Sequence, residues 1–396
     1  MIPLELDIVE PLGRLIARPW ADAVTGMQID SRRIAEGDLF VAVGGGVDFV
    51  EHALARGAAA ALVPDDAHAA LATVAGTVRD RSNAKIVAIT GSTGKTSTKD
   101  ILYAICAPRV KTIANEGNYN NELGVPLTLA RLEPDTELCI TELGMRGLGQ
   151  IAYLASFAKP DIGVITNVGP VHLELVETIE NVAKAKAELV AALPAGGVAV
   201  IPEEPLLDPH LERADITVER VDADAPLPFA TSYTAKHQIA NTRFAVVAAR
   251  HLGIPLPEHE LHVEFSKLRE EERELPGGGL LLNDCYNANP VSMRAALEHL
   301  SERANGRRRV AVLGEMAELG DGAPAYHEEI GGLVRELGIE RVIAVGGLAR
   351  AYGGEWVADA AGAVERLRGM LHPGDVVLVK GSRSVGLEVV AENLTS

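Results

Sequence analysis

The stretch KIVAITGSTGKTST, residues 85–98, decides the fold of this 396-residue chain. After Lys85, the next five residues are apolar or β-branched and predict a buried strand that ends at Thr90, and a helical pattern follows. The turn and first helical positions supply two glycines, a lysine and four hydroxyl residues: Gly91, Ser92, Thr93, Gly94, Lys95, Thr96 and Ser97. A strand, turn and helix in this order expose backbone amides at a helix N-terminus, where phosphate binds.

The spacing of this phosphate loop is TGxxGKT, which is shorter than the usual motif because position 89 is Ile rather than Gly. The glycines allow the backbone to approach phosphate closely, Lys95 suits the β- and γ-phosphates, and Thr96 suits magnesium. The alternative is that Ser92 and Thr93 simply cap the helix. With strand, glycine, lysine and threonine all in register, we predict nucleotide binding.

Composition limits the possible partners. The chain has 37 Lys plus Arg against 55 Asp plus Glu, a net charge of −18, with 47% hydrophobic and 23% charged residues. Such a chain is globular rather than disordered, and it repels nucleic acid and anionic membranes. Cys106, Cys139 and Cys285 form no CxxC pair, which indicates free thiols in a reducing compartment. Without a signal-like start or a long apolar run, we expect a cytoplasmic protein that does not insert into membranes.

Short apolar runs alternate with helical patterns along the chain, which predicts a doubly wound α/β protein with parallel sheets. The nine predicted strands are 39–43, 85–90, 137–143, 161–168, 197–202, 280–284, 309–314, 341–346 and 375–381. The Pro- and Asp-rich segment 203–233 is predicted to be a loop or a reduced subdomain. Residues 271–279 are predicted to be a charged, glycine-rich approach to the next strand.

Two strands end in polar residues that could hold a metal ion beside the phosphate loop. Residues 137–143 bring Glu142, and residues 161–168 lead through Asn167 to His172. An open parallel sheet places its ligands at these strand ends, and a carboxylate suits magnesium. The alternatives are that Glu142 is a solvated strand end and that His172 is an ordinary loop histidine.

One lysine falls on the apolar face of its helix. In the helix predicted within 177–194, Lys186 continues the spacing of the apolar residues, whereas Lys184 projects elsewhere. Such a lysine either extends its amine to solvent or is buried with a lowered pKa. A buried neutral amine could react with carbon dioxide, and the carbamate would be an oxygen ligand for a second magnesium.

Taken together, several motifs resemble the Mur ligase family: TGSTGKTS, GNYNNELGVPLTL, ITELGMRGLGQI, TNVGPVHLELVETIENVAKAKAE, HQIAN, DCYNANPVSMRAAL, VAVLGEMAELG and VKGSR. The resemblance covers nearly the whole chain. It implies three domains: a small N-terminal α/β domain (1–82) that binds the UDP substrate, a central parallel-sheet ATPase domain (83–257), and a C-terminal Rossmann-like domain (258–396). The last of these is expected to close on ATP and to bind the acceptor.

The member most resembled adds D-Ala-D-Ala to the terminal carboxylate of UDP-N-acetylmuramoyl-tripeptide, through an acyl phosphate, in peptidoglycan synthesis. The resemblance therefore implies ATP and two magnesium ions. We also expect the protein to be a monomer. Lys95 is expected to hold the β- and γ-phosphates, and Thr96 and Glu142 the first magnesium. His172 and carbamylated Lys186 are expected to hold the second.

The resemblance also suggests contacts for each substrate, with a structural alternative for several. Asn120 and Asn121 match residues that face the phosphates and acyl group, although an Asn-rich run is often only a turn. His237 and Asn241 match the adenine region or are merely part of a helix start. The remaining matches are Ser31 and Arg32 for UDP, Asp284, Tyr286, Asn287, Asn289 and Ser292 for ribose and dipeptide, and Lys380, Ser382 and Arg383 for anionic groups. Lys and Arg at a strand exit are otherwise solvated charge.

Three places depart from the family pattern. The stretch 44–50 is short and lacks an expected His, the segment between Ile201 and His237 is reduced, and the expected Gly-Arg before the C-terminal domain is replaced by KLREEERE. Every phosphate and metal position is present, which a degenerate paralogue would be expected to lose. The alternatives are another Mur-type or folylpolyglutamate-synthase-like ligase, a simple ATPase, and a non-catalytic ATP-binding regulatory protein.

Overall fold

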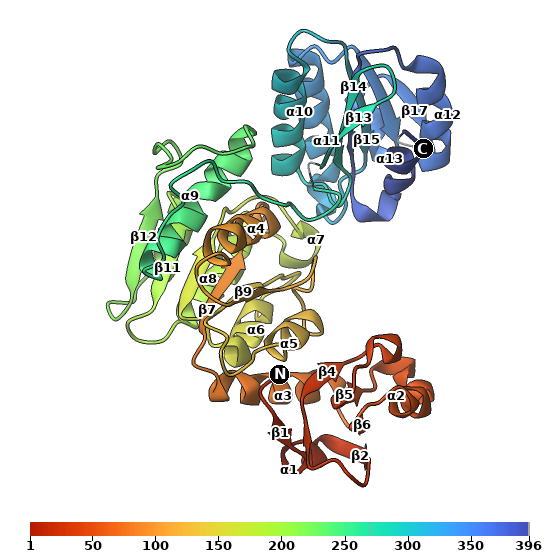
Figure 1. Ribbon diagram of the computed structural model, residues 1–396. Coiled ribbons are helices and arrows are strands. Elements are labelled where there is room, and N and C mark those ends of the chain that lie inside the picture. Colours follow the sequence, from red (N-terminus) through yellow and green to blue (C-terminus); the bar gives the residue numbers. More distant parts are fainter. Residues whose placement is uncertain (270, 395–396) are drawn as a thin grey trace.

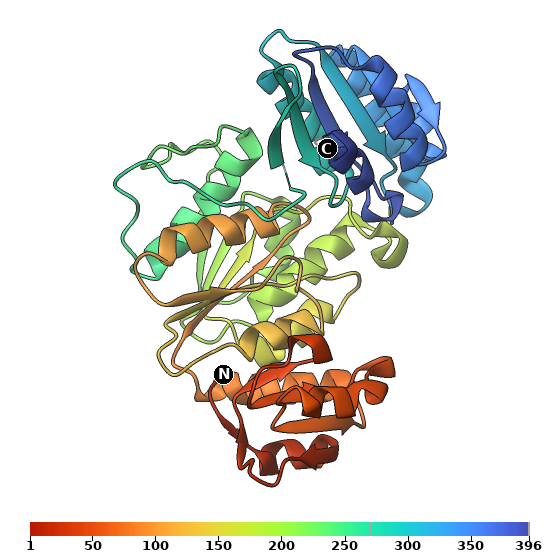
Figure 2. The ribbon, with the colours of Figure 1, turned by 45° about the vertical axis from the view of Figure 1, so that its right-hand side comes forward.

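The computed structural model describes residues 1–269 and 271–394. Three parts follow one another along the chain, each with its own sheet (Figure 1). The turned view keeps them in one row, with the central part between the other two (Figure 2). In the described part of the chain, no helix has the length and apolar character needed to cross a membrane.

The central part is built on a six-stranded sheet in the order β12-β11-β10-β7-β9-β8, in which every pair is parallel. Its elements are β7 (Lys85–Thr90), α4 (Lys95–Cys106), β8 (Thr112–Ala114), α5 (Gly124–Leu129), β9 (Leu138–Glu142), α6 (Gln150–Ala158), β10 (Ile162–Ile165), α7 (Leu173–Val176), α8 (Ile179–Ala191), β11 (Val198–Pro202), η4 (Pro205–His210), β12 (Thr217–Val221) and α9 (Lys236–His251). The next strands along the chain, β8 and β9, lie on one side of β7, and β10, β11 and β12 lie on its other side. The strand order therefore reverses at β7, and open sheets bind ligands at such a switch point.

Helices cover both faces of this sheet. Ile101 of α4 and Phe244 of α9 pack on one face, against Val87 and Ile140. The helices α5, α6 and α8 cover the other face (Figure 1). The buried strands are therefore apolar on both sides, as their near-continuous hydrophobic sequences predicted.

The N-terminal part has a four-stranded sheet in the order β2-β6-β5-β4, with an antiparallel β2 at one edge, and a separate pair β1-β3. Its elements are β1 (Leu4–Glu5), α1 (Leu6–Val9), η1 (Glu10–Leu12), β2 (Gly13–Ala17), β3 (Ala23–Val24), β4 (Gly26–Gln28), η2 (Ser31–Arg33), β5 (Asp38–Val41), η3 (Gly44–Phe49), α2 (Val50–Ala55), β6 (Ala60–Pro64) and α3 (Ala67–Arg81). The core is shared with the central part, because Leu71 and Val74 of α3 join Leu39 to Ile86 in one hydrophobic cluster.

The C-terminal part has a second six-stranded sheet, in the order β13-β14-β18-β15-β16-β17. Its elements are β13 (Glu271–Leu275), β14 (Gly279–Asp284), α10 (Pro290–Ala304), β15 (Arg309–Gly314), η5 (Gly320–Gly322), α11 (Ala323–Glu336), β16 (Arg341–Val345), η6 (Leu348–Tyr352), β17 (Glu355–Val357), α12 (Ala360–Met370), β18 (Val376–Lys380), η7 (Arg383–Val385) and α13 (Glu388–Leu394). All pairs are parallel except β13 with β14. Helices α10 and α11 cover one face, and α12 and α13 the other.

All nine strands predicted from sequence are present, with every end within three residues of its expected position. Two predictions were wrong in part. The segment 203–233 contains β12, which pairs with β11 at the sheet edge, and residues 271–279 contain β13, an antiparallel edge strand. Both are edge strands with largely exposed or half-buried side chains, so neither needs the apolar run that marks a central strand.

The central and C-terminal parts are joined by a linker fastened to the phosphate-loop helix. Asp100 of α4 accepts a 2.9 Å hydrogen bond from the Ser266 amide and pairs with Lys99 at 2.7 Å. Farther along the boundary, Lys236 of α9 pairs with Glu302 of α10 at 2.5 Å. The two parts therefore meet directly rather than standing apart on a free linker.

Candidate active site

The phosphate loop connects β7 to α4 at the switch point of the central sheet. Gly94 is the N-cap residue of α4, with a φ of 76° and no side-chain cap, so capping by Ser92 or Thr93 is not observed. A Cβ on Gly94 would lie 2.4 Å from Asn241 Oδ1, and a Cβ on Gly91, whose φ is 151°, would lie 1.9 Å from Thr166 Oγ1. Both positions therefore require glycine for conformation and for space.

The loop after β10 holds the phosphate loop in shape. Asn167 Oδ1 accepts from the Thr93 amide at 2.9 Å, and its Nδ2 donates to Thr93 Oγ1 at 2.6 Å. Ser92 Oγ donates to the Gly169 carbonyl and accepts from the Gly169 amide, both at 2.9 Å. Asn167 thus supports the loop backbone, and α4 is left with its uncapped N-terminus facing the cavity.

Three predicted residues converge at the start of α4. Lys95 Nζ donates to the Gly91 carbonyl at 2.8 Å, and Thr96 Oγ1 donates to Glu142 Oε2 at 2.7 Å. Glu142 is fully buried at the end of β9, which rules out a solvated strand end. Burial lowers the pKa of Lys95, with Glu142 opposing and Arg269 reinforcing that shift.

The Asn-rich run 118–121 packs around Glu142. Asn120 Nδ2 donates to Glu142 Oε1 at 2.7 Å, and the Glu142 amide donates to Asn115 Oδ1 at 2.9 Å. Asn121 Oδ1 accepts from the Gly124 amide at 3.0 Å and so stabilises the start of α5. Asn120 therefore orients the Glu142 carboxylate. Asn121 has a structural role, because its side chain stabilises the turn that leads into α5.

The lysine prediction for α8 is confirmed in its geometry: the Lys186 side chain is buried, with 1% exposure, whereas Lys184 is exposed. Burial lowers the pKa of Lys186 well below its usual value, and nearby Lys95 lowers it further. The pKa of His172 is also lowered, first by burial and then by Lys95 and Lys186, against an opposing contribution from Glu318.

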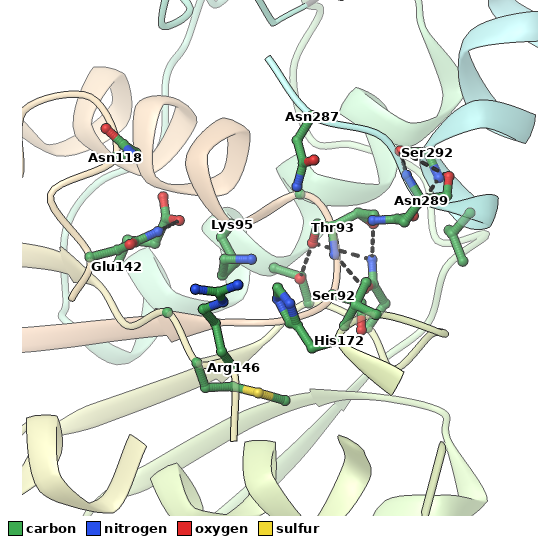
Figure 3. A pocket seen from close by; sticks show the side chains of 18 of the residues that line it. Ser92, Thr93, Lys95, Asn118, Glu142, Arg146, His172, Asn287, Asn289 and Ser292 are labelled. Carbon is green, nitrogen blue, oxygen red and sulfur yellow. Dashed lines mark hydrogen bonds between the residues drawn. The ribbon is translucent and has the colours of Figure 1, made fainter. Parts of the chain in front are cut away.

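Arg146 and Arg269 join these groups, and neither was expected from the sequence. The Arg269 guanidinium lies 4.1 Å from the centroid of the Tyr286 ring and within electrostatic reach of Lys95. Figure 3 shows Arg146 and His172 on one side of Lys95, with Asn287, Asn289 and Ser292 on the other. A protein of net charge −18 thus gathers several cations at one place, an arrangement that suits a polyphosphate.

The linker contributes Arg269 to the site. This arginine lies in the KLREEERE stretch that replaces the expected Gly-Arg, directly after Leu268. Leu268 has a φ of 62°, a left-handed conformation that favours glycine. Its carbonyl accepts from the Tyr286 amide at 3.2 Å, which holds the linker against the turn after β14.

Glu318 of the C-terminal part crosses the boundary to the central part, and it too was missed. Its carboxylate pairs with both His172 Nδ1 and the Arg146 guanidinium. These contacts, chiefly the hydrogen bond with His172, lower the pKa of Glu318, although burial, the largest single influence, opposes the shift. Glu318 lies in VAVLGEMAELG, one of the motifs that carry the family resemblance, but nothing in that motif indicates its partners.

A cavity of about 1510 Å³ collects most of the predicted site residues. Those that line it are Ser92, Thr93, Gly94, Lys95, Ser97, Asn120, Asn121, Glu142, His172, His237, Asn241, Asp284, Tyr286, Asn287, Asn289, Ser292, Lys380, Ser382 and Arg383. Gly91, Thr96 and Lys186 lie behind its wall, and Ser31 and Arg32 lie outside it. Ser31 instead contacts His52 Nδ1 at 2.9 Å, and the exposed Arg32 pairs with Asp30 at 2.8 Å.

The C-terminal wall of the cavity is tied together internally. Lys380 is buried and pairs with Asp284 at the end of β14, so it is not a solvated strand exit, whereas Arg383 is 56% exposed. Ser382 Oγ accepts from the Ala317 amide at 2.9 Å. Asn289 and Ser292 form a capping box at the start of α10, a structural role that explains their spacing.

The donor set fits a magnesium ion bound together with phosphate. Within 1–269 and 271–394, no three His, Cys, Asp or Glu side chains gather as a metal site by themselves. The buried Thr96 hydroxyl and Glu142 carboxylate are 2.7 Å apart, and these are hard oxygen donors. Magnesium takes few protein ligands and completes its shell with water and substrate phosphates, which matches this arrangement.

This arrangement, a phosphate loop at the switch point of a parallel sheet with a second, mostly parallel-sheet domain next to it, is typical of nucleotide-binding enzymes. Residues 89–244 match the Mur ligase middle domain, and residues 269–383 match the Mur ligase glutamate ligase domain. A UDP-N-acetylmuramoyl-tripeptide–D-alanyl-D-alanine ligase of Synechocystis is 34% identical, over 93% of this chain and 92% of its own length. The chain belongs to the Mur ligase family.

Two solved structures resemble the whole molecule. MurF from Acinetobacter baumannii superimposes with a TM-score of 0.85 at 25% identity, over 99% of this chain and 98% of its own. MurF ligase from Thermotoga maritima in complex with ADP gives 0.81 at 26% identity, over 94% and 97%. The three-domain α/β architecture expected from the sequence is therefore confirmed.

Proposed function

We propose that this protein is an ATP-dependent ligase that joins D-Ala-D-Ala to the terminal carboxylate of UDP-N-acetylmuramoyl-tripeptide. The product is the UDP-muramoyl-pentapeptide precursor of peptidoglycan. The observation that carries the proposal is one cavity with the phosphate-loop group Lys95, Thr96 and Glu142 at one side and the C-terminal wall at the other. The relatives that share most of the chain's length carry this activity in their names.

The reaction proceeds by phosphoryl transfer and then by amide formation. The tripeptide carboxylate attacks the γ-phosphorus of ATP, and ADP leaves, giving an acyl phosphate. The dipeptide amine then attacks the acyl carbon, and the tetrahedral intermediate expels phosphate. Lys95 is assigned to the β- and γ-phosphates, and Arg269 adds positive charge beside it. Asn121 is assigned to the acyl group. Positioning and charge stabilisation of this kind dominate phosphoryl-transfer catalysis.

Two magnesium sites are part of the proposal. Thr96 and Glu142 would hold one ion, and Asn120 would orient the Glu142 carboxylate. His172 and carbamylated Lys186 would hold the second. When bound, the ions would neutralise charge on the transferring phosphoryl group.

The carbamate is supported by the burial of Lys186 beside Lys95, which favours the neutral amine. A neutral amine adds to carbon dioxide and releases one proton, and the resulting anion offsets the neighbouring cations. Wild-type protein in ¹³C-bicarbonate should show a carbamate carbon by NMR that the Lys186→Ala variant lacks. An unmodified Lys186 amine in the mass and density of bicarbonate-treated protein would contradict the carbamate.

The remaining substrate contacts follow the walls of the cavity. His237 and Asn241 are assigned to the adenine end, although Asn241 also packs on Gly94. Asp284, Tyr286, Asn287 and Asn289 are assigned to ribose and dipeptide, and Lys380, Ser382 and Arg383 to anionic groups. Ser31 and Arg32 are assigned to UDP. The protein is proposed to act as a cytoplasmic monomer with domains 1–82, 83–257 and 258–396.

Phosphate release tests the function directly. ATP, magnesium and UDP-muramoyl-tripeptide should release phosphate only when D-Ala-D-Ala is added, with a product of pentapeptide mass. Release that ignores the dipeptide would indicate a simple ATPase. No release with any acceptor would favour the regulatory alternative, and release with another amine or carboxylate would indicate a related ligase.

A further inference from the structure

Glu318 is a carboxylate on the C-terminal side of the cavity that reaches toward the phosphate side. Both of its partners, His172 and Arg146, belong to the central part. His172 interacts electrostatically with Lys95 and Lys186, so Glu318 lies one contact away from the lysines of the phosphoryl-transfer site. Under the proposed function the acyl phosphate forms beside these lysines, so a carboxylate one contact away is near the incoming amine.

The loop that carries Glu318 is fixed by neighbouring elements. The Met316 amide donates to His327 Nε2 at 3.0 Å, and the Ala317 amide donates to Ser382 Oγ at 2.9 Å. The Glu318 carbonyl accepts from the Glu174 amide at 3.3 Å, and its φ is 62°. A non-glycine residue in this conformation between such anchors indicates that the position of the carboxylate is specified rather than incidental.

The other carboxylates that line the cavity have separate engagements. Glu142 lies between Thr96 and Asn120, Asp284 pairs with Lys380, and Glu203 lies 3.7 Å from Arg220. Asp66 caps α3 in the N-terminal part, and Asp66 and Glu122 both act on Tyr153, away from Lys95. Among these lining carboxylates, Glu318 is the one whose described partners, His172 and Arg146, lie across the domain boundary.

The acceptor of the proposed reaction is a zwitterion at neutral pH, because an α-amine has a pKa of about 8. Its carboxylate needs a cation, and Arg383 on the C-terminal wall is 56% exposed and pairs with Glu388 only at 3.6 Å, a weak contact that a ligand can replace. Ser382 joins the two regions, since it precedes Arg383 and its Oγ bonds to Ala317, next to Glu318. One rigid wall thus offers a cation and an anion, the pair of charges that a dipeptide zwitterion requires.

We propose that Glu318 binds the ammonium group of the dipeptide and directs the amine toward the acyl phosphate. In this structure the Arg146 guanidinium occupies that position. The side chain of Arg146 is 65% exposed, so its pairing with Glu318 is weak and readily exchanged. This inference rests on the proposed function, and the ammonium displaces Arg146 when the acceptor binds.

Steady-state kinetics of the full-length protein test the assignment. Glu318→Gln should raise KM for D-Ala-D-Ala about 10- to 100-fold, the usual cost of a charge-assisted hydrogen bond. KM for ATP and for the UDP-tripeptide should stay within about twofold, as those ligands contact other residues. Formation of the acyl phosphate without dipeptide, measured by positional isotope exchange in ¹⁸O-labelled ATP, should continue.

Two controls separate ammonium binding from a merely structural contact. Arg146→Gln removes the competing cation, so KM for the dipeptide, measured at saturating ATP, should stay equal or fall; any contribution of Arg146 to the polyphosphate site appears separately in KM for ATP. If Glu318 has only a structural role, both variants should raise KM for the dipeptide. A dipeptide analogue with hydroxyl in place of ammonium should inhibit wild type and Glu318→Gln with the same Ki. Equal weakening of the analogue and the dipeptide would overturn the assignment.

The result for wild type distinguishes the two proposals. Phosphate release that ignores the dipeptide in wild type would overturn the proposed function, and the role of Glu318 with it. Normal wild-type kinetics with an unchanged dipeptide KM in Glu318→Gln would overturn only the role of Glu318.

Discussion

The two sides of the cavity are built in different ways. At the phosphate side, Thr96, Glu142 and Asn120 are held by hydrogen bonds inside one domain, and Glu142 is fully buried. At the C-terminal side, Glu318 reaches its partners across a domain boundary, and Arg146 is mostly exposed. Buried bonds within a domain preorganise a reactive group, whereas exposed pairs between domains can exchange as a ligand enters.

The largest effect should follow from removing the lysine of the phosphate loop. Lys95→Ala should lower kcat about 10³-fold or more, because the transferring phosphoryl group loses a preorganised cation. Thermal stability should stay equal or rise, since the burial that lowers the pKa of Lys95 makes its charged form costly. Phosphate release measures kcat, and calorimetry measures thermal stability. A large loss of stability would show that the phosphate side is not preorganised as described.

The next effect concerns Lys186 and its neighbour Lys184 on the same helix. Lys186→Ala should abolish nearly all phosphate release, because the proposed carbamate cannot form. Lys184→Ala, a matched control at an exposed position, should keep activity within about twofold. Retained activity in Lys186→Ala would show that Lys186 only packs in the core and does not take part in the reaction.

A moderate effect is expected at the C-terminal wall. Asn289→Ala removes the N-cap of α10 and should cost about 1 kcal/mol, a fall in Tm of about 4 °C. Ser301→Ala, inside the same helix, should change Tm by less than half as much. Thermal unfolding of both variants checks this, and equal shifts would argue that the capping box does not stabilise the wall.

The smallest effect is a pH dependence at the base of that wall. The Glu272 carboxylate lies 3.8 Å from His299 Nε2 and accepts two hydrogen bonds of 2.8 Å from the Arg303 guanidinium. These contacts lower the pKa of Glu272 from its usual 4.5 to about 2. A lowered folded-state pKa adds stability above about pH 4.5, and that stability is lost as the pH falls toward 2. Wild type should therefore exceed Glu272→Gln in denaturant midpoint at pH 7, with the gap closing near pH 2; a constant gap would contradict the pairing.

Local rules were enough for the phosphate side. The strand 85–90 was predicted to the residue, and helical spacing placed Lys186 on the apolar face of its helix and Lys184 off it; the burial of Lys186 is what the structure adds. These features depend on periodicity and turn chemistry within about 20 residues, which a sequence displays directly.

The C-terminal side depends on contacts that no local pattern encodes. Arg146, His172 and Glu318 lie in three separate loops, and their meeting is decided by how two domains pack. Strand β13 was missed for a related reason: its charged residues find partners on neighbouring elements, as Glu272 does with Arg303, so its sequence shows no apolar alternation. The left-handed conformation of Leu268 became visible only from its backbone angle.

The three cysteines supply built-in probes of local opening. Cys139, Cys106 and Cys285 are buried in three different hydrophobic clusters, two in the central part and one in the C-terminal part. Burial raises each thiol pKa to about 12, so alkylating reagents can react only when the surrounding segment opens. Cys285 directly precedes Tyr286 on the cavity wall, so the rate at which it is labelled would report occupancy of the acceptor side, while Cys106 and Cys139 report the sheet beneath the nucleotide.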